Sequence, residues 1–126
     1  MLASPVLADL YERAGQAASR ALRDDSLEFF SRVFWFSLEF GVVSEGGELR
    51  AYGAGLLSSY GEIQAFRQAE TKRLDAAAMG AMSYDITRFQ PVLFAAGSLG
   101  EVVTVLGSFF DRYDDGAYDR LREERS

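Results

Sequence analysis

The chain contains no histidine and no cysteine among its 126 residues. Without cysteine, a disulfide framework, a zinc site built on thiolates and a thiol nucleophile are all excluded. Without histidine, the chain by itself offers no Ser-His-Asp triad, no imidazole base and no imidazole ligand for a metal. Any chemistry carried by these residues must therefore use carboxylates, tyrosines, lysine or arginine, or be completed by groups from elsewhere.

Basic residues are also in deficit. The sequence has 13 Lys and Arg against 19 Asp and Glu, which gives a net charge of −6 and a pI near 4.6. A nucleic-acid-binding face needs an excess of basic side chains, so this partner class is disfavoured. What the chain has is an ordinary globular composition, with 48% hydrophobic and 13% aromatic residues. This predicts one folded domain with a bulky interior.

Long apolar runs that would suit a signal peptide or a membrane span are missing. The N-terminus, Met1–Pro5, has no basic stretch followed by an apolar run. The most apolar window, residues 91–110, contains Glu101 and several Gly, Ser and Thr residues. A buried strand, a turn and a helix explain that window better than a bilayer span does. The cytoplasm is the expected location.

Apolar spacing and capping residues predict a mostly helical domain with a small antiparallel β component. Residues 1–113 form the domain, and the charged tail 114–126 is expected to fray. Asp24-Asp25-Ser26 is expected to signal the start of the second helix, because the helix dipole favours acid there. Gly41 is expected to end this helix as a C′ residue, and Gly46-Gly47 to form a hairpin turn. The expected helices are 5–22, 27–40, 60–68, 71–82 and one starting at Ser98; the expected strands are the hairpin 42–52 and residues 92–95; residues 53–55 are expected to be a loop.

Glu39 is the most informative single residue. It ends the most apolar helical segment, and Trp35 and Phe36 precede it by one turn on its own face. A carboxylate in apolar surroundings needs a cation, strong donors or a proton, so a metal ligand or catalytic acid is one interpretation. The other is a side chain that emerges into solvent or pairs with Arg32. The residues alone leave both open.

The segment 53–59 offers a second candidate region. It superficially resembles a phosphate-binding loop, but it follows a hairpin and lacks the Gly-Lys-Ser/Thr ending of a P-loop. Ser58 and Ser59 are expected to cap a helix, or to donate to a ligand or to a metal-bound imidazole. Tyr84 belongs to a turn-rich segment, where its phenol either reaches a site or packs in the core.

Three segments resemble one enzyme family. Residues 34–41 (FWFSLEFG), 51–59 (AYGAGLLSS) and 84–91 (YDITRFQP) occur in the same order and spacing in the pterin-dependent aromatic amino acid hydroxylases. Phenylalanine 4-monooxygenase-like members are the nearest type. The resemblance covers roughly residues 1–112 and implies a mostly helical catalytic domain around a non-haem Fe(II), truncated here at its N-terminal side.

The same resemblance implies site residues. Glu39 corresponds to the carboxylate of a 2-His-1-carboxylate metal site. Phe34 stands where the family often has a tyrosine near the pterin, and Ser58 is expected also to support a histidine ligand. The positions implied to contact the substrate are Trp35, Phe40, Gly55, Ser58 and Tyr84.

The resemblance also sets limits on activity. The family carries both histidine ligands on a His-x₄-His-x-Pro motif that comes shortly before the segment matching Met1–Pro5, and this chain has no histidine. A complete enzyme would hydroxylate phenylalanine or a related aromatic amino acid with O₂, Fe(II) and tetrahydropterin. The chain alone is expected to bind Fe(II) and pterin poorly and to be inactive, with the missing N-terminal half as its partner. The alternatives are a non-enzymatic module that binds an aromatic ligand or assembles with others, and a plain structural domain without a ligand. An uncovered apolar face on residues 27–40 is expected to drive self-association.

Overall fold

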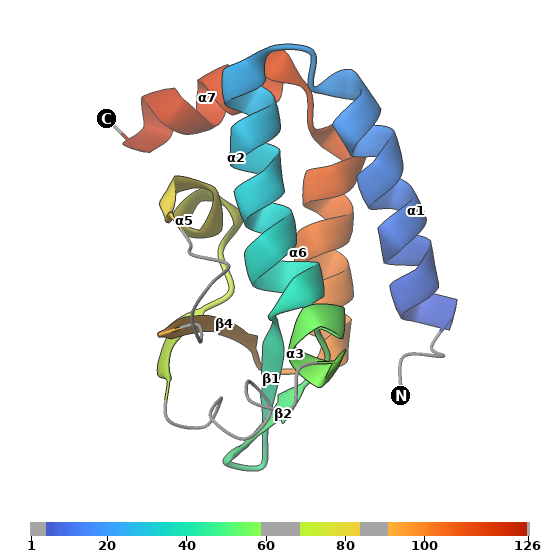
Figure 1. Ribbon diagram of the computed structural model, residues 1–126, viewed down its shortest axis with the longest axis vertical. Coiled ribbons are helices and arrows are strands. Elements are labelled where there is room, and N and C mark those ends of the chain that lie inside the picture. The colour runs from blue at the N-terminus through green and yellow to red at the C-terminus, as the bar shows by residue number, and fades with distance from the viewer. Residues whose placement is uncertain (1–4, 59–68, 84–90, 126) are drawn as a thin grey trace.

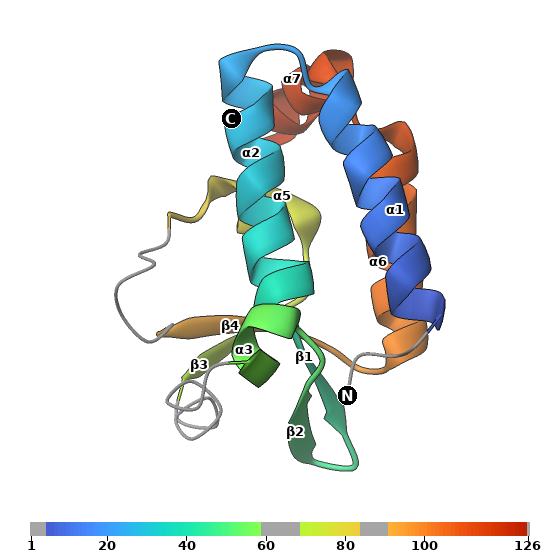
Figure 2. The same cartoon turned by 45° about the vertical axis from the view of Figure 1, so that its right-hand side comes forward.

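The computed structural model describes residues 5–58, 69–83 and 91–125. Helices α1 (Pro5–Arg20), α2 (Asp24–Phe34) and α6 (Leu99–Arg112) lie alongside one another, and a small sheet lies at one end of them (Figures 1 and 2). The fold is mostly helical, as the sequence predicts. None of the helices in the described ranges combines the length and the apolar character that a membrane crossing requires.

The helix boundaries follow local sequence signals closely. In α1, Leu7, Leu10, Ala14 and Ala17 are buried at helical spacing, and the helix ends two residues before the predicted residue 22. Helix α2 begins at Asp24, which confirms the start signal in Asp24-Asp25-Ser26, because acidic residues in a first turn are favoured by the helix dipole. At the start of α6, the Ser98 hydroxyl accepts a hydrogen bond from the Glu101 amide at 3.1 Å, which confirms the predicted cap.

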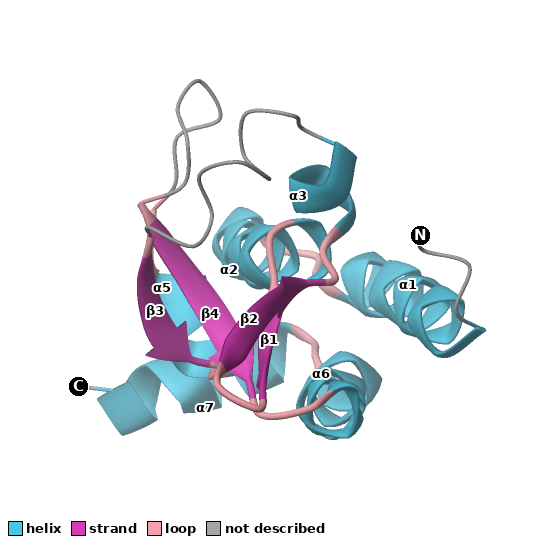
Figure 3. Ribbon diagram, turned by 90° about the horizontal axis from the view of Figure 1, so that it is seen from below, coloured by secondary structure: helices cyan, strands magenta, loops and turns pink. Residues whose placement is uncertain are grey.

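The sheet is mixed, with the strand order β2-β1-β4-β3. Figure 3 shows its four strands at one end of the helices. Strands β1 (Val42–Glu45) and β2 (Glu48–Ala51) form the predicted antiparallel hairpin. Its turn residues Gly46 and Gly47 have φ angles of 59° and 84°, which side chains rarely adopt. Strand β4 (Val92–Ala96) is also confirmed, but it pairs parallel with β1 and with β3 (Glu70–Arg73) rather than antiparallel.

Two segments differ from the predicted elements. Residues 54 and 55, predicted as loop, belong to the short helix α3 (Ala54–Ser58). The predicted helix 71–82 is wrong in its first half, because residues 70–73 pair with β4 as a strand. Its second half is helix α5 (Ala76–Ala81), started by the Asp75 carboxylate, which accepts from the amides of residues 77 and 78. The predicted helix 60–68 and its cap Ser59 lie outside the described residues.

The apolar side chains divide into a large and a small cluster. The large one joins α1, α2 and α6, and the small one consists of Phe40, Val42, Leu56 and Leu93 between the sheet, α3 and the end of α2. The large apolar side chains that remain exposed in the described ranges are Val6, Leu22 and Leu27. Of these only Leu27 belongs to the segment 27–40, in which Phe34 and Trp35 are partly exposed, so self-association through this segment stays a prediction.

The expected frayed tail is instead helix α7 (Asp115–Arg125). The Asp115 carboxylate accepts hydrogen bonds from the amides of Leu22 and Arg23, at 3.0 and 3.2 Å, and from the Ser26 hydroxyl. The Tyr118 ring packs on the edge of the Phe29 ring, with centroids 5.3 Å apart. The C-terminal helix is thus held at the junction between α1 and α2.

Replacing Asp115 by asparagine should reduce the stability of the chain at pH 7, and this reduction should become smaller at low pH. The Ser26 hydroxyl, followed by the backbone amides of Arg23 and Leu22, lowers the pKa of Asp115 below its usual value. A carboxylate with a lowered folded-state pKa stabilises the fold above its unfolded-state pKa and stops doing so as the pH falls through the folded-state pKa. The melting temperatures of the variant and the original chain should therefore differ at pH 7 and begin to converge as the pH falls below about 4, the ordinary pKa of an aspartate. A constant difference across that range, or a similar effect of Glu48→Gln on the exposed hairpin, would contradict this.

Candidate functional site

The last turn of the second helix is a π-helix, η1 (Trp35–Glu39), which continues directly from α2. Its mark is the hydrogen bond from the Phe40 amide to the Trp35 carbonyl, five residues back, at 3.0 Å. The buried Ser37 hydroxyl donates to the Val33 carbonyl at 2.6 Å inside the same turn. Such one-turn π segments within helices frequently occur at functional sites.

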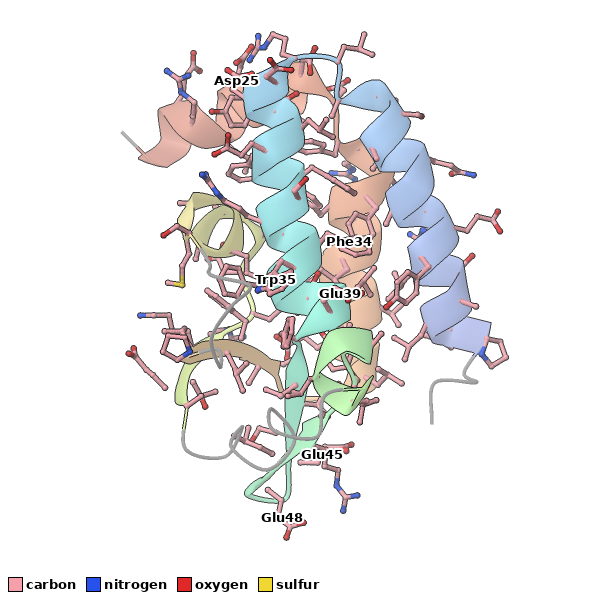
Figure 4. All side chains as sticks on the ribbon, in the orientation of Figure 1. Asp25, Phe34, Trp35, Glu39, Glu45 and Glu48 are labelled. Atoms are coloured by element: carbon pink, nitrogen blue, oxygen red, sulfur yellow. The ribbon has the colours of Figure 1, made fainter. Side chains whose placement is uncertain are left out.

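The wider turn changes the direction in which Glu39 points. The sequence placed Glu39 on one face with Trp35 and Phe36, as an α-helix would, but a π turn aligns it more closely with residue 34. In Figure 4, Phe34 and Glu39 lie on the side of the helix that faces α1. Phe36 is buried elsewhere, with its ring edge-on to Phe94 and the centroids 5.3 Å apart. The prediction that Glu39 and Phe36 share one face of the helix is therefore wrong.

Glu39 is half-buried against α1, and its contact there is a phenol. The Tyr11 hydroxyl lies 3.1 Å from the Leu38 carbonyl oxygen and 3.4 Å from Glu39 Oε2. Burial, followed by the charge and hydrogen bond of Glu39, raises the pKa of Tyr11 to about 12, so the phenol is a donor at neutral pH. Arg32 contacts Glu28 and the Gly80 carbonyl, so the alternative in which it pairs with Glu39 is wrong.

After the hairpin, the chain passes close to Glu39 again, opposite the contact with Tyr11 of α1. At its base, the amides of Tyr52 and Gly53 both donate to the Gly41 carbonyl at 3.1 Å. A Cβ at position 55 would lie 3.1 Å from Glu39 Oε1 and 3.0 Å from the Phe40 ring. The structure thus brings Gly55, one of the predicted substrate contacts, alongside the carboxylate.

Position 41 requires glycine because of close packing rather than because of its backbone conformation. It was expected as a left-handed C′ residue, but the positive φ angles in the described chain belong to the glycines of the hairpin turn. A Cβ on Gly41 would lie 2.1 Å from the Tyr52 hydroxyl and 2.3 Å from the Ser37 carbonyl oxygen. Glycine is needed here so that the tyrosine can cover the end of η1.

The remaining predicted site residues are only partly brought together. Trp35 and Phe40 pack on each other with ring centroids 4.6 Å apart, which leaves no room for a third ring between them. Phe34 meets the Tyr11 ring edge-on at 5.8 Å, so it also borders the Glu39 region. Ser58 ends α3, but its side chain and all of Tyr84 lie outside what the structure describes. Their roles, and that of Phe34 toward a pterin, stay predictions.

Sequence reasoning missed Tyr11 and Tyr52 as neighbours of this region. Tyr11 reads only as one of many apolar positions on the first helix, and its contact with Glu39 spans 28 residues. The Tyr52 hydroxyl is buried and has no hydrogen-bond partner in the described structure. Burial, and then the neighbouring Tyr11, raise the pKa of Tyr52 above its usual value. No local pattern signals either contact.

Replacing Tyr52 by phenylalanine should stabilise the chain by about 1 kcal/mol, since it removes a buried hydroxyl that lacks a partner. The matched control is Tyr113→Phe. Tyr113 is also buried, but its hydroxyl donates to the Ser26 carbonyl at 2.6 Å, so its loss should destabilise by about 1 kcal/mol. Urea unfolding of both variants measures the two signs. Destabilisation by Tyr52→Phe would mean that its hydroxyl has a partner.

The donor set around Glu39 does not make a metal site on its own. In the described residues, no group of three or more His, Cys, Asp or Glu side chains comes together. Glu39 can supply one oxygen ligand, whereas a mononuclear iron centre with open positions for oxygen needs three protein ligands. Among the described residues, Glu39 would therefore supply one ligand of such a centre, and the others would have to come from outside this group of residues.

Comparison with known proteins gives a consistent result. A family model described as biopterin-dependent aromatic amino acid hydroxylase matches residues 1–116. Phenylalanine 3-hydroxylase of Streptomyces coeruleorubidus is 50% identical over 121 residues, which cover 96% of this chain and 43% of that protein.

Solved structures agree with the sequence comparison. The phenylalanine hydroxylase of Legionella pneumophila superposes with a TM-score of 0.80 at 29% identity, over 98% of this chain and 52% of that one. The Chromobacterium violaceum phenylalanine hydroxylase with bound iron(III) and 7,8-dihydrobiopterin gives a TM-score of 0.71 at 25% identity, over 88% and 43%. The chain thus spans about half the length of each of these three proteins.

Proposed function

The chain belongs to the biopterin-dependent aromatic amino acid hydroxylase family, and from that membership we propose that it is the C-terminal part of a hydroxylase catalytic domain that supplies the carboxylate ligand of the metal. The observation that carries the proposal is the position of Glu39. It lies at the end of a π turn, half-buried, with Tyr11 on one carboxylate oxygen and Gly55 beside the other. This is a carboxylate whose neighbours restrict its orientation.

We propose an aromatic amino acid as the substrate, with phenylalanine as the first compound to test, and Fe(II), O₂ and a tetrahydropterin as the other components. The names of the Streptomyces and Legionella proteins support phenylalanine. The iron and dihydrobiopterin of the Chromobacterium structure support the two cofactors. The proposed partner is the rest of the catalytic domain, which carries the His-x₄-His-x-Pro motif, and the proposed location is the cytoplasm.

The test begins with the DNA immediately upstream of the Met1 codon, read in the same frame. If it encodes His-x₄-His-x-Pro, the extended chain should hold about one Fe(II) per protein and hydroxylate phenylalanine with tetrahydropterin. In it, Glu39→Gln should reduce turnover at least 100-fold, because loss even of a residue that supports a ligand costs about 10–100-fold. The 126-residue chain should bind Fe(II) weakly and show no turnover.

Three results would overturn the proposal: an upstream stop codon, turnover by the 126-residue chain alone, or full activity of the extended Glu39→Gln variant. The first would favour the alternative, a binding module without catalysis. That alternative has its own measurement, because the chain has a single tryptophan, Trp35, next to Phe40. Saturable quenching of its fluorescence by phenylalanine, without iron, would support the binding module.

A further inference from the structure

Tyr11 reaches the end of η1 from α1, far away in the sequence. Its hydroxyl is within hydrogen-bond reach of two acceptors that neighbour each other along the chain, the Leu38 carbonyl at 3.1 Å and Glu39 Oε2 at 3.4 Å. One phenol proton shared between two oxygens in this way is a three-centre hydrogen bond. The contact therefore ties a backbone atom of the π turn and a side-chain atom of Glu39 to the same donor.

The Leu38 carbonyl needs such a donor. It is one of the last carbonyls of the helical segment, which have no amide further along the helix to bind. Leu38 is 1% exposed, so water does not readily replace the missing partner. The Tyr11 ring is itself held edge-on against Phe34, with the centroids 5.8 Å apart. The hydroxyl thus has a fixed position from which to act on Glu39.

The opposite side of the carboxylate is closed by backbone. Gly55 stands so near Glu39 Oε1 that an added Cβ would lie 3.1 Å from it. The Glu39 carboxylate therefore has a neighbour on each side, the Tyr11 phenol at Oε2 and the first turn of α3 at Oε1. Neighbours on both sides lower the number of rotamers open to a glutamate side chain.

We propose that Tyr11 is a positioning residue that holds the Glu39 carboxylate in one orientation, with Gly55 as the opposing wall. This inference rests on the proposed function, in which the carboxylate is a metal ligand. A ligand held in place before the metal arrives loses less conformational freedom on binding. The Tyr11 hydroxyl touches no substrate in this role and acts through Glu39 alone.

The experiment measures the order of the Glu39 side chain without any metal. Carbon-13 relaxation is recorded on the glutamate side chains of the 126-residue chain, with the exposed Glu45 and Glu48 as internal references (Figure 4). Glu39 should be clearly more ordered than both references. The variant Tyr11→Phe keeps the ring and loses only the hydroxyl. In it, the order of the Glu39 side chain should fall to the level of Glu45 and Glu48, because the donor to its carboxylate is gone.

The matched control is Tyr113→Phe, which removes another phenol that donates to a backbone carbonyl, at the junction of α1 and α2. It should leave the order of Glu39 unchanged even if stability falls, so a general loosening of the fold is distinguished from a positioning role. Gly55→Ala serves as a second variant, since it presses on Oε1 and should shift the Glu39 carboxyl resonance while Tyr11 is intact. This second readout applies even if Tyr11→Phe folds poorly.

Glu39 as mobile as Glu48 in the original chain, or unchanged in Tyr11→Phe, would overturn the proposal. Neither result depends on iron. The proposed function fails separately, if the extended Glu39→Gln variant keeps its iron and its turnover. In that extended chain, Tyr11→Phe should weaken Fe(II) binding about 10–100-fold, the range seen when a group that supports a ligand is removed.

Discussion

Gly53→Ala should destabilise the chain by about 3 kcal/mol, the upper end of the range for an overpacked site. The Cβ would lie 2.5 Å from both the carbonyl carbon and the oxygen of Glu39, and 2.7 Å from the Gly41 nitrogen. All three are backbone atoms, so no side chain can rotate away to make room. Relief requires the base of the hairpin to separate from the end of η1. Urea unfolding followed by circular dichroism measures the loss.

Gly15→Ala is the matched control for this substitution. Gly15 lies in the exposed part of α1, and a Cβ there would meet no atom within 4 Å. Alanine is the better helix former, so this variant should gain about 0.5–1 kcal/mol. If Gly53→Ala were no more harmful than Gly15→Ala, the contact between residue 53 and the Glu39 carbonyl would not exist in solution.

Ending the chain after Asp114 should lower the melting temperature by about 10 °C. The deletion removes α7, whose Ala117, Tyr118 and Leu121 pack against the large apolar cluster. Their half-buried apolar surface contributes on the order of 3 kcal/mol, without counting the hydrogen bonds of Asp115. For a domain of this size, about 1 kcal/mol corresponds to roughly 4 °C. The buried Phe29 and Tyr113 would also gain exposure.

A shorter deletion serves as the control. Ending the chain after Glu123 keeps Asp115, Tyr118 and the ion pair between Arg23 and Asp119 at 2.6 Å, so its melting temperature should change by less than about 2 °C. Differential scanning calorimetry on both truncated chains gives the comparison. Equal melting temperatures for the chains ending at residues 114 and 123 would mean that α7 contributes no packing energy.

Elements with strong local signals were predictable. The hairpin followed from Gly46-Gly47, because two successive positive φ angles are cheap only for such residues. The start of α6 followed from Ser98, whose hydroxyl satisfies an amide that the helix leaves free. In both places the interaction that specifies the structure lies within a few residues, where a sequence pattern can reveal it.

Elements specified by distant partners were not predictable. Strand β3 has the sequence ETKR with all four side chains exposed, so it shows no apolar alternation, and it exists because β4 offers a parallel edge. Helix α7 is charged, and a charged terminus usually suggests fraying. What orders it is Asp115, which meets the amides of Leu22 and Arg23 more than 90 residues earlier.

The sequence singled out Glu39 as a candidate site residue, but it did not predict the geometry around that carboxylate. An acid in an apolar helix singled out Glu39, and the family resemblance named Trp35, Phe40 and Gly55 with it. The sequence pattern did not predict the π turn at residues 35–39. This turn directs Glu39 away from Phe36 and toward Tyr11, a residue to which neither the helical pattern nor the resemblance gave a role.

The hairpin between η1 and α3 has a base whose length is fixed by its contacts and a tip whose length can change. Its base is fixed, since two amides share the Gly41 carbonyl beside Glu39. Its tip, Gly46-Gly47, is exposed and lies at the end of the hairpin away from Gly41 and Glu39. A peptide grafted at the tip, with equal additions to both strands, would leave the carboxylate where it is, whereas one extra residue in a single strand would create a bulge and twist the base. The tip is therefore the place to attach a label or an affinity tag close to the site without altering it.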